Sequence, residues 1–128
     1  MTQQTLVRSQ VLLVEDEAII AMLMEDMLAE FSCDVLETVG ELDAATAAAM
    51  TTRFDMAFVD VNLGGSPAYP VADILRARGI PFAFVTGYGS AGGSAAYADV
   101  PVLQKPFRAQ ELEAIIERLR AQSITKAS

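Results

Sequence analysis

The sequence of 128 residues contains no histidine and no tryptophan, and it has a single cysteine, Cys33. Without histidine, the side chain best suited to proton transfer near neutral pH is missing, so any chemistry must use carboxylates, hydroxyls, lysine or a metal ion. One cysteine cannot form an internal disulfide, and without histidine or a second cysteine the chain has no ligand set for zinc. We therefore interpret Cys33 as a structural thiol near a helix end.

Basic residues are also scarce, because nine lysines and arginines stand against 17 acidic residues and give a net charge of −8. Recognition of nucleic acid needs a basic face that displaces counterions from phosphates, and the arginines here are dispersed along the chain. We expect no nucleic-acid partner. No stretch reaches the roughly 18 apolar residues of a membrane span, and the N-terminus has no apolar signal segment. These absences predict a cytoplasmic protein without membrane insertion.

The length and the apolar content of 52% fit one domain. We expect an N-terminal extension at residues 1–8, a domain at residues 9–121 and a C-terminal tail at residues 122–128. Because the sequence ends after the last predicted helix, we expect no attached output domain. Nothing in the sequence argues for an oligomer, so we expect a monomer, and dimerisation through the face of the fourth strand stays an open alternative.

Five short apolar runs alternate with segments of helical pattern. Strands are predicted at Val11–Val14, Val35–Val39, Met56–Val59, Ile80–Val85 and Val100–Leu103. Helices are predicted at residues 17–31, 41–51, 70–78, 94–99 and 108–122, of which the fourth is short and weak. This alternation indicates an α/β fold, in which right-handed crossovers place helices on both faces of one parallel sheet.

Polar side chains follow four of these strands. Asp60 ends the central run and precedes a loop predicted at residues 64–67, while Glu15-Asp16, Thr86 and Lys105 stand at the ends of the first, fourth and fifth strands. The carboxyl ends of parallel strands meet at one edge of a sheet, where ligands bind in open α/β sheets. We therefore expect these side chains to face one crevice.

Three carboxylates from neighbouring strands would repel one another and raise their pKa values unless a cation joined them. A hard divalent cation with oxygen ligands is the natural partner, and magnesium binds through one or two carboxylates together with a phosphate. Thr86 and Lys105 have the donor and the point charge that phosphoryl oxygens need. The pattern thus predicts a site for a phosphoryl group.

The same residues lie in motifs that resemble the receiver domain of two-component response regulators. The motifs are VEDE at 14–17, FVDVN at 58–62, VTG at 85–87 and QKPF at 104–107, and the resemblance covers residues from about 9 to 121. It implies a flavodoxin-like, doubly wound, five-stranded parallel sheet of order 2-1-3-4-5. It also implies a single-domain response regulator in a phosphorelay, signalling through protein–protein interaction or acting as a phosphate shuttle or sink.

By this resemblance, Asp60 accepts the phosphoryl group from a phosphohistidine of a sensor histidine kinase and forms an acyl phosphate. Thr86 and Lys105 contact the phosphoryl oxygens, and the Lys105-Pro106 peptide is expected to be cis. The resemblance assigns Mg²⁺ to the carboxylates and to one backbone carbonyl, and these metal ligands are Glu15, Asp16, Asp60 and Asn62. The chain would catalyse only its own phosphorylation and dephosphorylation, and would not be an enzyme in the ordinary sense.

A narrower resemblance concerns the segment PFAFVTGY at 81–88, which is similar to the PFxFATGY signature of alphaproteobacterial FAT GUY receivers. It implies a kinase of the HWE family as partner, and a histidine phosphotransfer protein is a further candidate. Val102 stands where typical receivers have an aromatic residue that takes part in switching. Our hypothesis is that Tyr88 and the glycine-rich loop Gly87–Gly93 carry the switch instead.

Two other classes stay open. A pseudo-receiver that only binds proteins is compatible with Val102. A Mg²⁺-dependent phosphohydrolase with an aspartate nucleophile would share Asp60, a threonine and a lysine, but Asn62 stands where such enzymes usually have a second acid. Phosphorylation by a small phosphodonor discriminates between these classes.

Overall fold

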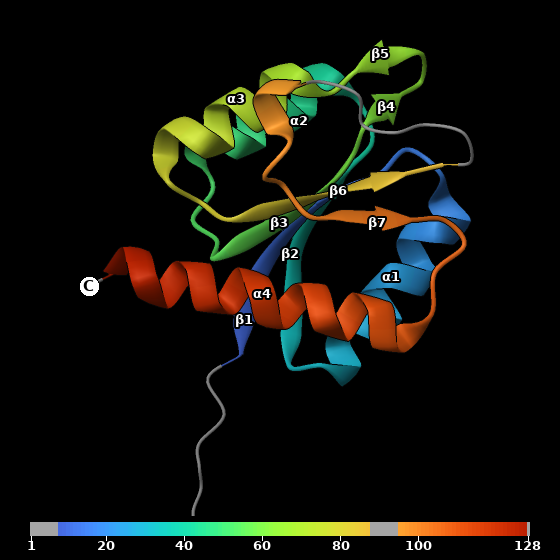
Figure 1. Cartoon of the computed structure of the whole chain (residues 1–128). Helices are drawn as coiled ribbons and strands as arrows, with labels where there is room; N and C mark the ends of the chain where they lie inside the picture. The colour runs from blue at the N-terminus through green and yellow to red at the C-terminus, as the bar shows by residue number, and fades with distance from the viewer. Residues whose placement is uncertain (1–7, 88–94, 128) are drawn as a thin grey trace, which may run out of the picture.

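A computed structural model of the chain describes residues 8–87 and 95–127 and has one central sheet of five parallel strands. The strands lie in the order β2-β1-β3-β6-β7 (Figure 1). Their bounds are β1 (Ser9–Val14), β2 (Cys33–Val39), β3 (Met56–Asp60), β6 (Phe82–Thr86) and β7 (Val102–Gln104). Strands β6 and β7 are the fourth and fifth strands of this sheet along the chain, so the observed order is the predicted 2-1-3-4-5. The prediction of a flavodoxin-like α/β fold is confirmed.

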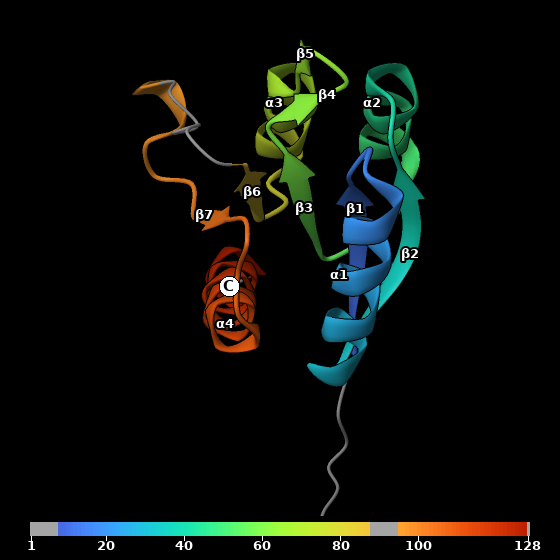
Figure 2. The same cartoon turned by 90° about the vertical axis from the view of Figure 1, so that its right-hand side faces the viewer.

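Within the described residues, four α-helices cover the two faces of the sheet (Figures 1 and 2). On one face lie α1 (Ala18–Glu30) and α4 (Ala109–Ala127), and on the other lie α2 (Leu42–Thr51) and α3 (Tyr69–Arg78). Successive residues of β1 alternate between the two cores, with Val11 packed toward α1 and α4 and Leu12 toward α2 and α3. A strand buried on both faces reads as a continuous apolar run, which is why β1 and β3 are clear in the sequence.

Three predicted segments differ from the structure. The helix predicted at residues 94–99 is a single 3₁₀ turn, η1 (Ala95–Tyr97), because this stretch has no apolar periodicity to bury. Helix α4 continues to Ala127, past the predicted end at residue 122, so the expected tail is helical over most of its length. No glycine or proline stops the helix there.

None of the described helices is both long and apolar enough to cross a bilayer.

The third difference is a small antiparallel hairpin where a loop was predicted. It consists of β4 (Asn62–Leu63) and β5 (Ser66–Pro67), and Gly64 and Gly65 form its turn with φ angles of +56° and +92°. Two consecutive positive φ angles match the tight turns that right-twisted hairpins prefer, and glycine adopts them without a Cβ clash. The hairpin lies beyond the carboxyl end of β3 (Figure 1).

An aromatic cluster fixes the chain between η1 and the last strand. The Tyr97 ring stacks on Tyr69 of α3 with a centroid separation of 5.4 Å, and it packs in a T-shaped arrangement with Phe84 of β6 at a centroid separation of 5.6 Å. The Tyr97 hydroxyl donates a hydrogen bond to Asp73. These contacts hold η1 on α3, and the chain then returns into β7 beside β6.

Candidate functional site

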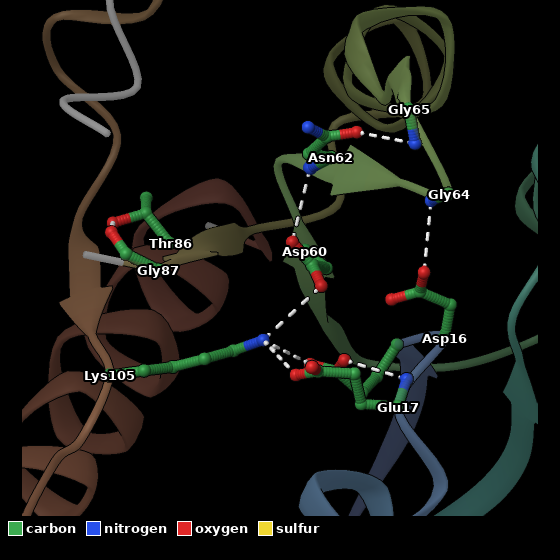
Figure 3. A network of polar contacts seen from close by, with 10 residues as sticks. Asp16, Glu17, Asp60, Asn62, Gly64, Gly65, Thr86, Gly87 and Lys105 are labelled. Carbon is green, nitrogen blue, oxygen red and sulfur yellow. Dashed lines mark hydrogen bonds and ion pairs between the residues drawn. The ribbon is translucent and has the colours of Figure 1, made fainter. Parts of the chain in front are cut away.

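The strand ends that the sequence analysis singled out meet at one edge of the sheet (Figure 3). Asp60 is the last residue of β3, Glu15 and Asp16 follow β1, and Lys105 follows β7. Glu15, Asp16 and Asp60 each offer a carboxylate oxygen, and these oxygens lie within 4.8 Å of one another. Beside them is an open hollow of about 350 Å³. This edge therefore has the three acids and the lysine in one place.

The Lys105 ammonium lies between carboxylates from three positions. Its Nζ is 3.0 Å from Glu15 Oε1, 3.3 Å from Asp60 Oδ2 and 3.4 Å from Glu17 Oε1. Burial alone would lower the pKa of Lys105, but the Glu15 and Asp60 carboxylates outweigh it and raise the pKa above its usual value. The ammonium is thus firmly charged and links the outer strand β7 to the acids of β1 and β3.

Glu15 is the most deeply placed acid, and 3% of its surface is exposed. Desolvation raises the pKa of Glu15 to about 7, with a smaller contribution from the Asp60 charge, while the Glu17 amide and Lys105 act in the opposite direction. Its Oε2 accepts a hydrogen bond from the Glu17 backbone N–H at 3.0 Å. Among the described residues, none donates to Oε1 with hydrogen-bond geometry, although Lys105 Nζ is near. A cation at this oxygen would satisfy it.

The pKa of Glu15 makes a prediction for the metal-free protein. Because the folded-state pKa of about 7 exceeds the ordinary value of 4.5, the folded chain binds the Glu15 proton more tightly than the unfolded chain. The resulting stabilisation is complete below about pH 4.5 and is lost as pH rises through 7. Between pH 5 and pH 7 we expect the unfolding free energy of the wild type to fall by ~2 kcal/mol relative to Glu15→Gln.

Urea unfolding of both proteins in a chelator, at several pH values in this range, measures that difference. The comparison with Glu15→Gln cancels the titration of the other carboxylates. Parallel pH profiles of the two proteins would contradict the raised pKa of Glu15.

Asp60 is held by both of its oxygens. Oδ1 accepts a hydrogen bond from the Asn62 backbone N–H at 3.1 Å, and Oδ2 accepts one from Lys105 Nζ at 3.3 Å. The chain continues to pair with β6 just beyond it, since the Val61 N–H donates to the Val85 carbonyl at 3.0 Å. Asp60 is 6% exposed. A carboxylate fixed on a central strand next to an open hollow is placed to meet a ligand without moving.

Asp16 is exposed and contacts the hairpin. Its Oδ2 accepts a hydrogen bond from the Gly64 N–H at 2.9 Å, while Asn62 Oδ1 accepts one from the Gly65 N–H at 2.9 Å. A Cβ at Gly40 would lie 3.2 Å from the Asp16 Cα, so the loop after β2 packs closely on this backbone. Neither Gly64 nor Gly40 was assigned to the site from the sequence.

Thr86 ends β6 next to the site, and its hydroxyl is directed away from Asp60 (Figure 3). The residue is 1% exposed, and Oγ1 donates to the Gly87 carbonyl at 3.3 Å. In Figure 3 this side chain lies away from the Asp60 carboxylate. The backbone of Thr86 accepts a hydrogen bond from the Lys105 N–H at 2.8 Å, which joins the ends of β6 and β7. A contact between the Thr86 hydroxyl and a ligand at Asp60 therefore requires a side-chain rotation.

The remaining sequence-based expectations have mixed outcomes. The Lys105-Pro106 peptide is cis, as expected. Val102 pairs with Phe84 and is 45% exposed, so an apolar side chain of moderate size occupies the position of the usual aromatic residue. Tyr88 lies outside the described residues, together with the loop that follows it, and the switch hypothesis stays a prediction. Glu17, assigned only to a helix start, is an ion-pair partner of Lys105.

Comparisons with known proteins agree with this geometry. The family model described as "Response regulator receiver domain" matches residues 11–117. The chain is 37% identical in sequence to SdrG from Sphingomonas melonis Fr1, whose solution structure superposes with a TM-score of 0.77. The match covers 94% of this chain and 99% of the SdrG chain. The BeF3-activated conformation of SdrG from Pseudomonas melonis Fr1 is 40% identical over 86% of this chain and 94% of its own, with a TM-score of 0.73.

A more distant likeness is to the response regulator domain of PhyR from Erythrobacter litoralis. It is 25% identical over 89% of this chain and 91% of its own, with a TM-score of 0.72. A search of curated protein sequences gave no match. The family model spans most of the chain, and the SdrG structure matches it almost end to end. The chain therefore belongs to the response regulator receiver domain family.

Proposed function

We propose that this chain is a single-domain response regulator that accepts a phosphoryl group on Asp60 from the phosphohistidine of a sensor histidine kinase. The observation that carries the proposal is the placement of Asp60. Its carboxylate ends a buried central strand, borders an open hollow and lies 3.3 Å from a lysine ammonium and near two further acids. A nucleophilic carboxylate, a fixed positive charge and room for a ligand are what phosphoryl transfer requires.

In the proposed reaction, an Asp60 oxygen attacks phosphorus, so that a P–O bond forms while the P–N bond of the phosphohistidine breaks. The electron pair of the P–N bond stays on the leaving imidazole nitrogen. Lys105 stabilises the charge on the transferring group from its position beside Oδ2. The Thr86 hydroxyl rotates away from the Gly87 carbonyl and donates a hydrogen bond to a phosphoryl oxygen. This chain has no histidine, so the donor is another protein or a small phosphodonor.

A Mg²⁺ ion fits the acidic residues of the site. Glu15, Asp16 and Asp60 provide hard oxygen donors within reach of one cation, and Glu15 Oε1 has no hydrogen-bond donor among the described residues. We propose that these three carboxylates and the Asn62 backbone carbonyl hold the ion. When bound, Mg²⁺ neutralises negative charge on the phosphoryl oxygens.

The acyl phosphate is the signal in this proposal, and the chain itself promotes its formation and its hydrolysis without acting on a separate substrate. The chain acts in the cytoplasm in this proposal, and its partner is a histidine kinase, for which the PFAFVTGY segment suggests the HWE family. A histidine phosphotransfer protein is the alternative partner. The phosphorylated chain then binds a target protein, or serves as a phosphate shuttle or sink. The likeness to SdrG over 94% of this chain supports the assignment of a receiver to this role.

Incubation with acetyl phosphate and Mg²⁺ tests the proposal. We expect a gain of one phosphoryl group in the intact mass, lost on mild alkaline treatment as an acyl phosphate should be, and absent without the metal. Steady release of phosphate from varied esters would instead indicate a phosphohydrolase. No modification by acetyl phosphate or by any co-expressed kinase would indicate a pseudo-receiver that only binds proteins.

A further inference from the structure

The β4–β5 hairpin directs two backbone N–H groups at two different carboxylates of the site. The Asn62 N–H donates to Asp60 Oδ1 at 3.1 Å, and the Gly64 N–H donates to Asp16 Oδ2 at 2.9 Å. Figure 3 shows the hairpin beside the acids, with the two dashed lines running from it to Asp60 and Asp16. One short element thus contacts an acid of β3 and an acid that follows β1.

The shape of this hairpin depends on a side chain. Asn62 Oδ1 accepts a hydrogen bond from the Gly65 N–H at 2.9 Å, across the turn that Gly64 and Gly65 form. The hairpin has two residues per strand, and among the strands that the structure describes it pairs with none of the main sheet. So short a hairpin has little stability of its own. The side-chain hydrogen bond that closes the turn therefore helps to fix the direction of the Gly64 N–H.

Asp16 depends on that N–H for its orientation. It lies outside β1 and is exposed, so packing does not fix its side chain. The Gly64 hydrogen bond occupies Oδ2, and in Figure 3 the other carboxylate oxygen points toward Asp60. With Oδ2 held, the second oxygen is presented to the space between the acids, where a cation would lie. A ligand held in its binding orientation before the ion arrives loses less conformational entropy on binding.

We propose that Asn62 is a positioning residue for the divalent cation. Its side chain closes the glycine turn, and the Gly64 N–H in that turn orients the Asp16 carboxylate toward the ion. This inference rests on the Mg²⁺ site of the proposed function and deepens it. It is separate from the metal contact expected of the Asn62 backbone carbonyl, which any residue at this position would provide.

The test compares Asn62→Ala with the wild type, and Ser66→Ala serves as a control that trims an exposed side chain on the same hairpin. Calorimetric titration with Mg²⁺ alone measures affinity, and amide hydrogen exchange by NMR, without metal, reports on the Gly64 N–H. We expect Asn62→Ala to bind Mg²⁺ about threefold to tenfold more weakly and to exchange the Gly64 amide faster. Ser66→Ala should match the wild type in both measurements.

A second variant, Asn62→Asp, keeps an oxygen that can accept the Gly65 hydrogen bond, so it should retain slow exchange at Gly64 without metal. A purely structural role for Asn62 would lower the melting temperature and leave the Mg²⁺ affinity unchanged. Unchanged affinity in Asn62→Ala, or weaker affinity with an unaltered Gly64 amide, would overturn the inference while the metal site stands. A wild-type chain that binds no Mg²⁺ would overturn both the metal site and this role.

Discussion

We expect Asp60→Asn to stay folded and to take up no phosphoryl group from acetyl phosphate and Mg²⁺. The carboxamide has almost the same shape as the carboxylate, and its oxygen can still accept the Asn62 N–H, so the local structure persists. The amide is not a nucleophile toward phosphorus, and the variant also lacks one of the three clustered acids. We expect the mass gain seen in the wild type to disappear completely.

Although Asp60→Asn should lose phosphorylation, we do not expect it to lose stability. Replacing Asp60 by asparagine relieves its repulsion of Glu15, which is one cause of the raised pKa of Glu15. We therefore expect an equal or higher melting temperature for Asp60→Asn in metal-free buffer. Asp43→Asn, which removes an exposed acid at the start of α2, is the matched control and should be phosphorylated like the wild type. Persistent labelling of Asp60→Asn would refute Asp60 as the acceptor.

Lys105→Met should destabilise the metal-free protein by ~2 kcal/mol. Removing one partner of a buried ion pair leaves the other charge uncompensated, which typically costs several kcal/mol. Here the side chains of Glu15 and Asp60 are 1% and 8% exposed, and both lose their neighbouring ammonium. The cost is at the lower end because Glu15, with a pKa of about 7, takes up a proton instead.

Urea unfolding at neutral pH, with and without Mg²⁺, measures this effect. A divalent cation among the acids replaces part of the missing positive charge, so Mg²⁺ should stabilise Lys105→Met more than it stabilises the wild type. Asp99→Asn breaks an ion pair with Arg76 in which the side chains are 45% (Arg76) and 72% (Asp99) exposed, so we expect it to change the unfolding free energy only slightly. A loss for Lys105→Met no larger than that of Asp99→Asn would contradict the role assigned to Lys105.

The elements that could be predicted from the sequence are those whose signal is local. Strands β1 and β3 are buried on both faces, so each is a continuous apolar run, and the polar residue at its end marks where the core stops. The order of the sheet was expected from the resemblance of the strand-end motifs to receiver domains, because strand alternation by itself gives only a parallel sheet with helices on both faces. The convergence of Glu15, Asp60 and Lys105 at one edge follows from that order.

The features that were missed depend on contacts between distant residues or on very short elements. Glu17 and Lys105 are 88 positions apart in the chain, and their ion pair leaves no local pattern. Strands of two residues, such as β4 and β5, have no periodicity, and the contact between Gly64 and Asp16 spans 48 positions. Tyr97 is held in position by ring contacts with Tyr69 and Phe84, although the helix propensity of its own segment is low.

The distribution of charge around the hollow has a consequence at long range. The ammonium of Lys105 lies beside the carboxyl groups of Glu15, Glu17 and Asp60, and a fourth carboxyl group, that of Asp16, lies near Glu15 and Asp60. Before any cation binds, this edge of the molecule has a negative electrostatic potential, which attracts small cations and slows the approach of anionic phosphodonors. Salt screens such a potential within roughly 10 Å. Ionic strength therefore acts on how fast a phosphodonor arrives as well as on the chemistry that follows.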